Sequence, residues 1–199
     1  MKRNIKMMIP ITILILLMII SVTHVEWNDK NGVGTVNRAE AVELSEASKY
    51  LEALSIIIPN SEVHALDFTV ESLLGDSESL NDYRGKVIFL NFWATWCGPC
   101  RTEVDEIDTL HETLKDEDFM IMALSIQEKK NKVSKFMESN NIDFPVYLDS
   151  DGSVAAMYGV TGIPTTYIIA PDGKIVGRAV GPREWGGKES VELMKSLMK

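Results

Sequence analysis

The first pattern in the chain is a long apolar stretch near its start. Residues 7–25 contain no charged side chain, and Lys2, Arg3 and Lys6 precede them. A helix needs about 17–25 predominantly apolar residues to cross a bilayer. Basic residues before the stretch and acidic residues after it favour an orientation with the N-terminus in the cytoplasm. Residues 1–25 are therefore predicted to form a cytoplasmic leader and a transmembrane signal anchor, with the rest of the chain outside the cytoplasm.

A cleaved signal peptide is the alternative for the same stretch. The segment after it, SVTHVEW, has no small-x-small cleavage site, and the nearest candidate at residues 39–41 lies far downstream. No cysteine is present there to carry a lipid anchor. An uncleaved anchor is therefore the favoured interpretation. Both interpretations place the remaining chain in an extracytoplasmic, oxidising compartment.

Residues 26–60 are predicted to form a linker followed by an amphipathic helix. The linker is polar and contains two glycines, and Asn37 with Glu40 resembles a capping box. Apolar residues then follow helical spacing up to the residue before Pro59, namely Leu44, Ala47, Leu51, Leu54 and Ile58. This apolar stripe could pack on the domain, pair with another chain or lie at the membrane. Packing on the domain is the default expectation.

Residues 61–199 alternate between strand-length apolar runs and helical patterns. The run at 87–94 is apolar throughout, which suits a parallel strand buried on both faces. The turn at 171–173 predicts a hairpin between its flanking strands. The pattern predicts an α/β domain of the mixed-sheet type, with helices on both faces. The predicted strands are 66–70, 79–80, 87–94, 119–126, 145–148, 165–170 and 174–181, and the predicted helices are 97–115, 130–140, 153–158 and 189–198.

Composition narrows the class of partner. The 199-residue chain has a net charge of -9, and beyond residue 24 it carries 17 basic against 29 acidic side chains. Nucleic-acid binding needs clustered Lys and Arg, so this acidic domain is a poor candidate for it. Anionic lipid headgroups would also repel it. The simplest role of the charge is to keep the domain soluble.

The chain has only two cysteines, Cys97 and Cys100, within the segment WATWCGPC. A zinc site needs about four ligands, and His24, His64 and His111 are scattered without ligand spacing. A structural disulfide across so short a loop would remove little entropy from the unfolded chain. A Cys-x-x-Cys pair that follows a buried strand and opens a helix favours redox chemistry.

The predicted placement gives the two thiols different roles. Cys97 would lie at the helix N-terminus, where the dipole and free backbone N–H groups stabilise a nucleophilic thiolate. Cys100, one turn further on, should be more buried and keep its proton. Gly98 would let a substrate backbone approach, and Pro99 suits the first helical turn.

The tryptophans beside the motif are expected to differ. Trp93 precedes the motif at the end of the apolar run, and we expect it to serve mainly in packing. Trp96 is expected to shape the exposed surface beside Cys97.

The motif WCGPC after an apolar strand resembles the thioredoxin superfamily. The strings at 79–100 and 144–176, together with the N-terminal stretch, look like its membrane-anchored TlpA/ResA-like branch, over about residues 62–199. The resemblance implies a thioredoxin-like fold and a bacterial, extracytoplasmic thiol-disulfide oxidoreductase without an organic cofactor. It also implies protein disulfides as substrates, including those of cytochrome c maturation. Recycling would need a membrane thiol-electron donor of the cytochrome biogenesis transporter type.

The resemblance also assigns residues outside the motif. Pro164 would be cis and face the dithiol, and Ile163 would offer backbone hydrogen bonds to a substrate strand. Asn91 occupies the position of a buried aspartate in many thioredoxins, and it cannot accept a proton at neutral pH. Water or another acid would then deprotonate Cys100; Glu128 is a weak candidate, because a solvated surface glutamate is the simpler expectation. Some ResA-like proteins have glutamate at Gly98, so the cytochrome-specific assignment is weakened.

The Gly-Pro dipeptide is the one found in reducing thioredoxins, so a reductase is the favoured function. A disulfide oxidase or isomerase is the alternative direction. A thiol peroxidase would need a Thr-x-x-Cys context, but Thr95 lies only two residues before Cys97. A copper chaperone would need a histidine near the dithiol, and a scaffold would need neither cysteine. The loop at 181–189, with Arg183 and Trp185, could line a substrate groove or simply connect strand to helix.

Overall fold

The computed structural model describes residues 40–198. The predicted anchor, the linker and the Asn37 cap lie outside the described residues. Among residues 40–198, no helix has the length and apolar character required to span a bilayer.

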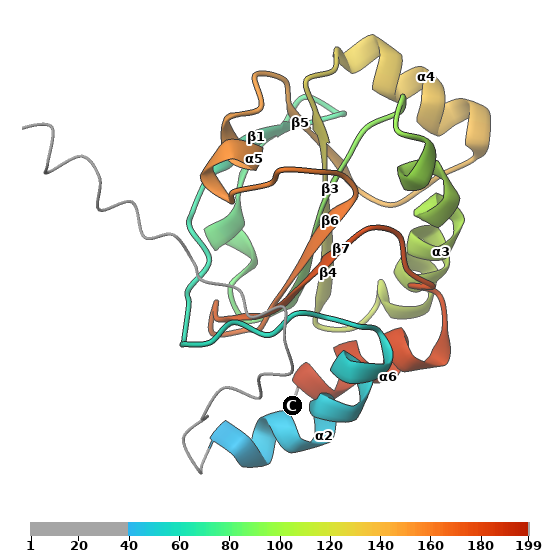
Figure 1. The fold of residues 1–199 in the computed structure, drawn as a ribbon. Helices are drawn as coiled ribbons and strands as arrows, with labels where there is room; N and C mark the ends of the chain where they lie inside the picture. Colours follow the sequence, from blue (N-terminus) through green and yellow to red (C-terminus); the bar gives the residue numbers. More distant parts are fainter. Residues whose placement is uncertain (1–39, 199) are drawn as a thin grey trace, which may run out of the picture.

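The described chain forms one seven-stranded mixed sheet with helices on both faces, as predicted (Figure 1). The strands, from one edge to the other, run β2-β1-β5-β4-β3-β6-β7. In chain order the elements are α2 (Glu40–Ala53), β1 (Thr69–Ser72), β2 (Ser77–Ser79), the 3-10 helix η1 (Leu80–Tyr83), β3 (Val87–Trp93), α3 (Gly98–Leu114), β4 (Phe119–Ile126), α4 (Lys130–Asn140), β5 (Val146–Asp149), α5 (Ser153–Met157), β6 (Thr165–Ile169), β7 (Ile175–Val180) and α6 (Lys188–Leu197).

Strand β3 positions the chemistry, because the Cys-x-x-Cys segment follows its end. It pairs in parallel with β4 and antiparallel with β6, and all seven of its residues are buried. A strand covered on both faces reads as a continuous apolar run. The predicted burial of this strand on both faces is therefore confirmed. The sheet changes from parallel to antiparallel pairing at β3.

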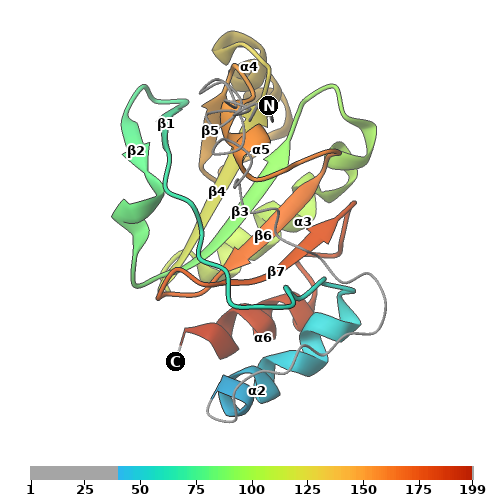
Figure 2. The same cartoon turned by 60° about the vertical axis from the view of Figure 1, so that its left-hand side comes forward.

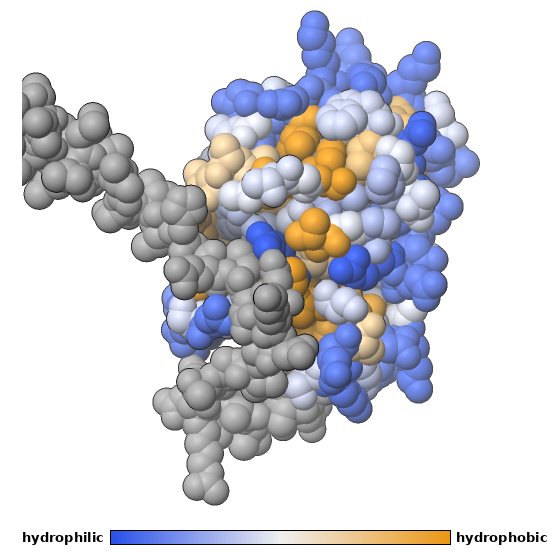
Figure 3. Space-filling model, in the orientation of Figure 1, coloured by the Kyte–Doolittle hydropathy of each residue, from blue (hydrophilic) through white to orange (hydrophobic). Residues whose placement is uncertain are grey.

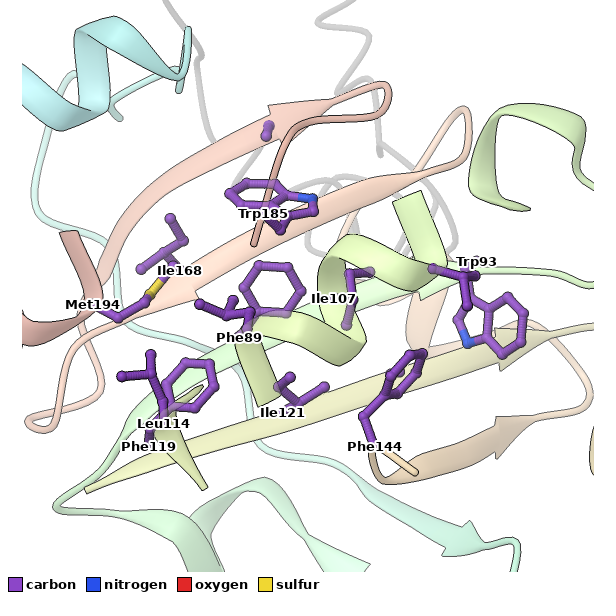
Figure 4. Packing of buried hydrophobic residues seen from close by; sticks show 14 of the residues in the cluster. Phe89, Trp93, Ile107, Leu114, Phe119, Ile121, Phe144, Ile168, Trp185 and Met194 are labelled. Carbon is purple, nitrogen blue, oxygen red and sulfur yellow. The ribbon is translucent and has the colours of Figure 1, made fainter. Parts of the chain in front are cut away.

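Alternate residues of β3 enter two separate hydrophobic clusters. Val87, Phe89 and Trp93 pack with side chains of α2, α3, α4 and α6. Ile88 and Leu90 pack on the other face with residues of α5 and the segment before β1. Figure 1 shows α3 and α4 on one side of the sheet and α5 on the other. Figure 4 shows the first cluster between β3, β4, β6 and the helix α3.

Helix α2 packs on the domain, which was the default expectation. Figures 1 and 2 both show it lying beside α6, and its residues Ala47 and Leu51 are completely buried in the first cluster. The prediction that the helix continues to Ile58 is wrong, because α2 ends at Ala53. Ser55 adopts a left-handed φ of 50°, and the chain beyond it runs along β7 instead.

The first two strands also begin and end elsewhere than predicted. Apolar residues suggested strands at 66–70 and 79–80, whereas β1 and β2 are the polar segments on either side of a turn at Leu73–Asp76. Strand β1 is held between β2 and β5, so pairing with neighbours decides its position. The hydrophobicity of a short segment says little about where such a strand near the edge of the sheet begins and ends.

Candidate redox site

The two cysteines lie at the start of α3 and form a disulfide. Cys97 is the N-cap residue, and its Sγ accepts a hydrogen bond from the backbone N–H of Cys100 at 3.1 Å. Pro99 occupies the first turn, where its missing N–H costs nothing. Cys97 keeps 5% of its surface exposed and Cys100 only 1%. The predicted difference in burial is present, and the N-terminus of α3 would stabilise a thiolate on Cys97.

A loop from the other side of the sheet faces the dithiol. The peptide bond between Ile163 and Pro164 is cis, as the resemblance implies. The carbonyl oxygen of Ile163 lies 3.6 Å from Cys97 Sγ. The loop is fixed to the start of the 181–187 loop, because Gly181 donates its N–H to the carbonyl of Pro164 at 2.8 Å. Residues distant in sequence thus meet at Cys97.

The exposed surface around Cys97 is partly apolar. The Trp96 side chain is 58% exposed, and Gly98 and Pro99 are exposed beside it. Val180, at the end of β7, is 47% exposed and pairs with Thr165, the residue after Pro164. Figure 3 shows apolar side chains gathered among hydrophilic ones on the face seen there. Such a surface suits contact with an extended polypeptide.

Trp93 lies inside the first cluster rather than at the surface. It is 2% exposed, and its ring packs on Phe136 of α4 with ring centroids 5.6 Å apart. This placement fits the packing role expected from the sequence.

A buried acid that the sequence analysis missed lies one helical turn beyond Cys100. Glu103 is 1% exposed and follows Cys100 by three residues on α3, so both lie on the buried face of the helix. Asn91 donates its Nδ2–H to Glu103 Oε1 at 3.1 Å and to Thr166 Oγ1 at 2.9 Å. Asn91 therefore supports an acid instead of replacing one.

Burial gives Glu103 a proton affinity suited to neutral pH. Loss of solvation raises its pKa to about 7, although hydrogen bonds from Asn91, Trp185 and the Arg183 backbone partly oppose the rise. The sequence held one signal for this residue. Cys100, Val104, Ile107, Leu110 and Leu114 mark the inward face of α3, and Glu103 is the one charged residue on that face.

The 181–187 loop completes the surroundings of Glu103. The backbone N–H of Arg183 donates to Glu103 Oε2 at 3.2 Å, and Trp185 Nε1–H donates to the same oxygen at 3.0 Å. Trp185 is completely buried and packs edge-to-face on Phe89, with centroids 4.9 Å apart (Figure 4). Trp185 therefore cannot line an open groove, and the loop does more than connect β7 to α6.

The expectation that Glu128 is a solvated surface residue is wrong. It is 5% exposed and accepts hydrogen bonds from the Thr95 N–H at 2.7 Å, the Thr95 hydroxyl at 2.6 Å and the Ser125 hydroxyl at 3.0 Å. Lys132 forms an ion pair with it at 2.7 Å. Burial raises its pKa, but the bonds from Lys132 and Thr95 outweigh burial and hold the pKa below its usual range. A carboxylate so satisfied anchors the WATWC segment and is a poor proton acceptor.

The two histidines within the described residues lie away from the dithiol. His111 is in the last turn of α3, whereas Cys97 caps its first turn. His64 pairs with Lys174, at the end of the β6–β7 hairpin opposite Pro164. Neither is placed as the histidine ligand that a copper chaperone would need near the cysteines.

Comparison with known proteins agrees with this geometry. Residues 62–178 match the model of the AhpC/TSA family. The chain is 39% identical over 117 residues to the thiol-disulfide oxidoreductase ResA of Bacillus subtilis, covering 59% of this chain and 65% of that protein. It thus spans just under two thirds of that relative's length. With ResA of Bacillus thuringiensis it shares 34% identity over 135 residues, 68% of this chain and 75% of the relative.

Solved structures show the same fold. A putative thiol:disulfide interchange protein DsbE from Chlorobium tepidum superposes with a TM-score of 0.64 at 29% identity, covering 69% of this chain and 97% of that one. StoA of Bacillus subtilis superposes with a TM-score of 0.53 at 25% identity, covering 60% and 90%. The chain belongs to the AhpC/TSA family, among its thioredoxin-like thiol-disulfide oxidoreductases.

Proposed function

We propose that the protein reduces disulfide bonds of other proteins outside the cytoplasm, through the Cys97–Cys100 pair. The observation that carries this proposal is the N-cap position of Cys97, with the more buried Cys100 and the acid Glu103 behind it. Disulfide reduction by a dithiol uses a nucleophilic thiolate that a substrate can reach, a second thiol that is more protected, and a group that takes the proton of the second thiol.

The reaction begins with the reduced protein. The Cys97 thiolate attacks one sulfur of a substrate disulfide, which forms a mixed disulfide and releases one substrate thiolate that takes a proton from solvent. Cys100, after losing its proton, attacks Cys97 Sγ. This step breaks the mixed disulfide, releases the second substrate thiol and leaves the Cys97–Cys100 disulfide. Two electrons pass from the protein to the substrate, and an external dithiol must return them.

Glu103 supplies the proton acceptor in the second step. Its pKa of about 7 lets it take the Cys100 proton near neutral pH and release it afterwards. Asn91, Arg183 and Trp185 keep the carboxylate in place by donating hydrogen bonds to it.

The substrate would bind across the exposed surface beside Cys97. Trp96, Gly98 and Pro99 border the nucleophile, and Ile163 and Pro164 face it from the opposite loop. Ile163 would hydrogen-bond an extended substrate segment through its backbone. No organic cofactor enters the reaction.

The apolar character of residues 7–25 supports a location on the outer side of a bacterial membrane, with a single-pass anchor. A membrane thiol-electron donor of the cytochrome biogenesis transporter type would recycle the dithiol. Precursors of c-type cytochromes are one class of substrate. Membrane fractionation with protease digestion of intact cells tests the location: the domain should sediment with membranes and be digested once the outer surface is accessible, whereas protection or recovery in the soluble fraction contradicts the anchor.

The reduction potential of the Cys97–Cys100 pair tests the direction of transfer. The full chain is equilibrated with a dithiol buffer, since α2 forms part of the core. A value at or below the thioredoxin level, roughly -270 mV, is expected for a reductase. A value near roughly -120 mV would instead make the protein a disulfide donor. The Cys97→Ser, Cys100→Ser variant provides the blank.

A further inference from the structure

Arg183 connects two parts of the molecule that are far apart in the sequence. Its guanidinium donates hydrogen bonds to the carbonyls of Leu54 and Ser55, just beyond the end of α2, at 2.7 and 3.3 Å. It also donates to the carbonyls of Val180, Gly181 and Pro182, at 3.2, 3.1 and 2.9 Å. One side chain therefore joins the N-terminal helix to the 181–187 loop.

The chemistry of this contact matches its position. The carbonyls of Leu54 and Ser55 lie in the turn that follows α2, next to the helix C-terminus, which carries the negative end of the helix dipole. A planar guanidinium has five N–H donors and stays charged at every relevant pH, so it can bond several carbonyls at once. A lysine could supply the charge without the same multiple contact.

The backbone of the same residue reaches the redox site. The Arg183 N–H donates to Glu103 Oε2, and Trp185 donates to the same oxygen two residues later. The position of this N–H depends on where the guanidinium holds the loop. On the other side, the carbonyls of Leu54 and Ser55 are placed by a left-handed turn at Ser55 and by a bond from the Ile56 N–H to the Leu51 carbonyl at 2.8 Å.

We infer that Arg183 is a positioning residue that couples the docked helix α2 to the carboxylate of Glu103. The segment that precedes the thioredoxin-like domain then helps to set the state of the acid beside the dithiol. This inference rests on the proposed function for its meaning, but the contacts and their test do not require it.

The groups that face Glu103 make Arg183 the dominant cation. Strands β3 and β6 present only the neutral Asn91 and Thr166 to this network. The loop presents Arg183 and the neutral Trp185. On α3, Cys100 lies three residues before Glu103, and Glu106 three residues after it bonds the Gly186 N–H at 3.0 Å. Loss of Arg183 should therefore weaken the ionised form of Glu103.

The test measures the ionisation of Glu103 in the full-length oxidised protein, in which no thiol titrates. Carbon-13 NMR of glutamate carboxyl groups follows the titration, and Glu103→Gln identifies the signal. The variant Arg183→Met should lower the acid dissociation constant of Glu103 about tenfold, because a nearby cation is lost and the backbone N–H that donates to Glu103 is no longer held in place. The variant Arg183→Lys should recover only part of that loss.

A matched pair of variants at Ser55 tests the coupling without altering the loop. Ser55 is exposed and has a φ of 50°, which glycine accepts and proline cannot. Ser55→Gly should titrate like the wild type. Ser55→Pro should displace the two carbonyls and lower the Glu103 dissociation constant in the direction of Arg183→Met, although Arg183 is still present.

Two outcomes would overturn the inference. If Ser55→Pro and Ser55→Gly both titrate like the wild type, α2 does not act on Glu103. If Arg183→Lys equals the wild type while Arg183→Met does not, only the charge matters. Should Ser55→Pro fail to fold, the Arg183 pair still decides the question. These titrations do not depend on the direction of electron transfer. A reduction potential that contradicts the proposed reductase would therefore leave them interpretable, and failure of the proposed function can be told from failure of this inference.

Discussion

At the scale of single residues, Glu103 is the group that distinguishes this site from a dithiol on a bare helix. Replacing it with glutamine keeps its size and removes the proton acceptor. We expect Glu103→Gln to slow the attack of Cys100 on a mixed disulfide at Cys97 by about a hundredfold near pH 7, the lower end of the range for loss of a general base. Stopped-flow measurement of glutathione release from a mixed disulfide at Cys97 gives this rate.

The pH profile separates catalysis from damage to the fold. In the wild type the rate should rise as Glu103 ionises around its pKa of about 7, and in the variant that limb should be absent. Glu112→Gln is the control, because Glu112 lies on the exposed last turn of the same helix and pairs with Lys115. If Glu103→Gln and Glu112→Gln slow the attack of Cys100 equally, Glu103 is not the proton acceptor.

The residues also show how far sequence could lead to this site. The position of Cys97 and Cys100 followed from a buried strand and a helix-compatible motif, both of which are local. Glu103 lies on the apolar face of α3, but its hydrogen-bond partners, like a partner of Glu128, come from distant segments. Arg183 and Trp185 lie 80 and 82 residues from Glu103, and Thr95 lies 33 from Glu128. No local pattern contains such pairings.

At the scale of elements, the docking of the N-terminal segment depends on a glycine in β7. A Cβ on Gly177 would lie 2.4 Å from Ile56 Cγ2 and 3.2 Å from the Ile57 carbonyl oxygen. Ile57 exchanges two backbone hydrogen bonds of 2.8 Å with Arg178, so the segment cannot retreat without losing them. We expect Gly177→Ala to destabilise the protein by about 1–3 kcal/mol, the usual cost of overpacking, as measured by urea unfolding.

A double-mutant cycle tests the cause of that loss. Ile56→Ala removes the Cγ2 atom and by itself costs packing energy, since Ile56 is 7% exposed. If the two side chains collide, the double variant should be more stable than the sum of the single effects allows. Strict additivity would show that Gly177 is required for another reason.

The packing of this segment on β7 also explains why helical periodicity placed the end of α2 too late in the chain. The apolar residues from Leu44 to Ile58 keep helical spacing beyond the point where the helix ends. Ile56 is nevertheless buried, because it packs on β7 in an extended segment. Strand β4 and helix α4, by contrast, were predicted with their observed bounds. Each has a regular pattern of apolar residues that stops clearly at both ends.

At the scale of the whole molecule, Glu103 should leave a signature in stability. Its pKa in the folded protein is about 7 against 4.5 for an ordinary glutamate, so the folded state binds more protons between these values. The free energy of unfolding must then fall as pH rises through this window. Glu128 acts in the opposite direction, but only at lower pH, because its pKa lies below the usual value.

Urea unfolding of the oxidised protein between pH 5 and pH 8 therefore isolates Glu103. The wild type should lose about 2–3 kcal/mol more across this range than Glu103→Gln, since each unit of pKa displacement corresponds to about 1.4 kcal/mol. Parallel curves for the two proteins would mean that Glu103 titrates normally in the folded state. The hydrogen bonds from Asn91, Arg183 and Trp185 would then stabilise an ionised carboxylate, and the pKa of the acid behind Cys100 would no longer be matched to neutral pH. A larger decrease in the free energy of unfolding of the wild type would instead show that burying Glu103 near the dithiol destabilises the folded protein above pH 5.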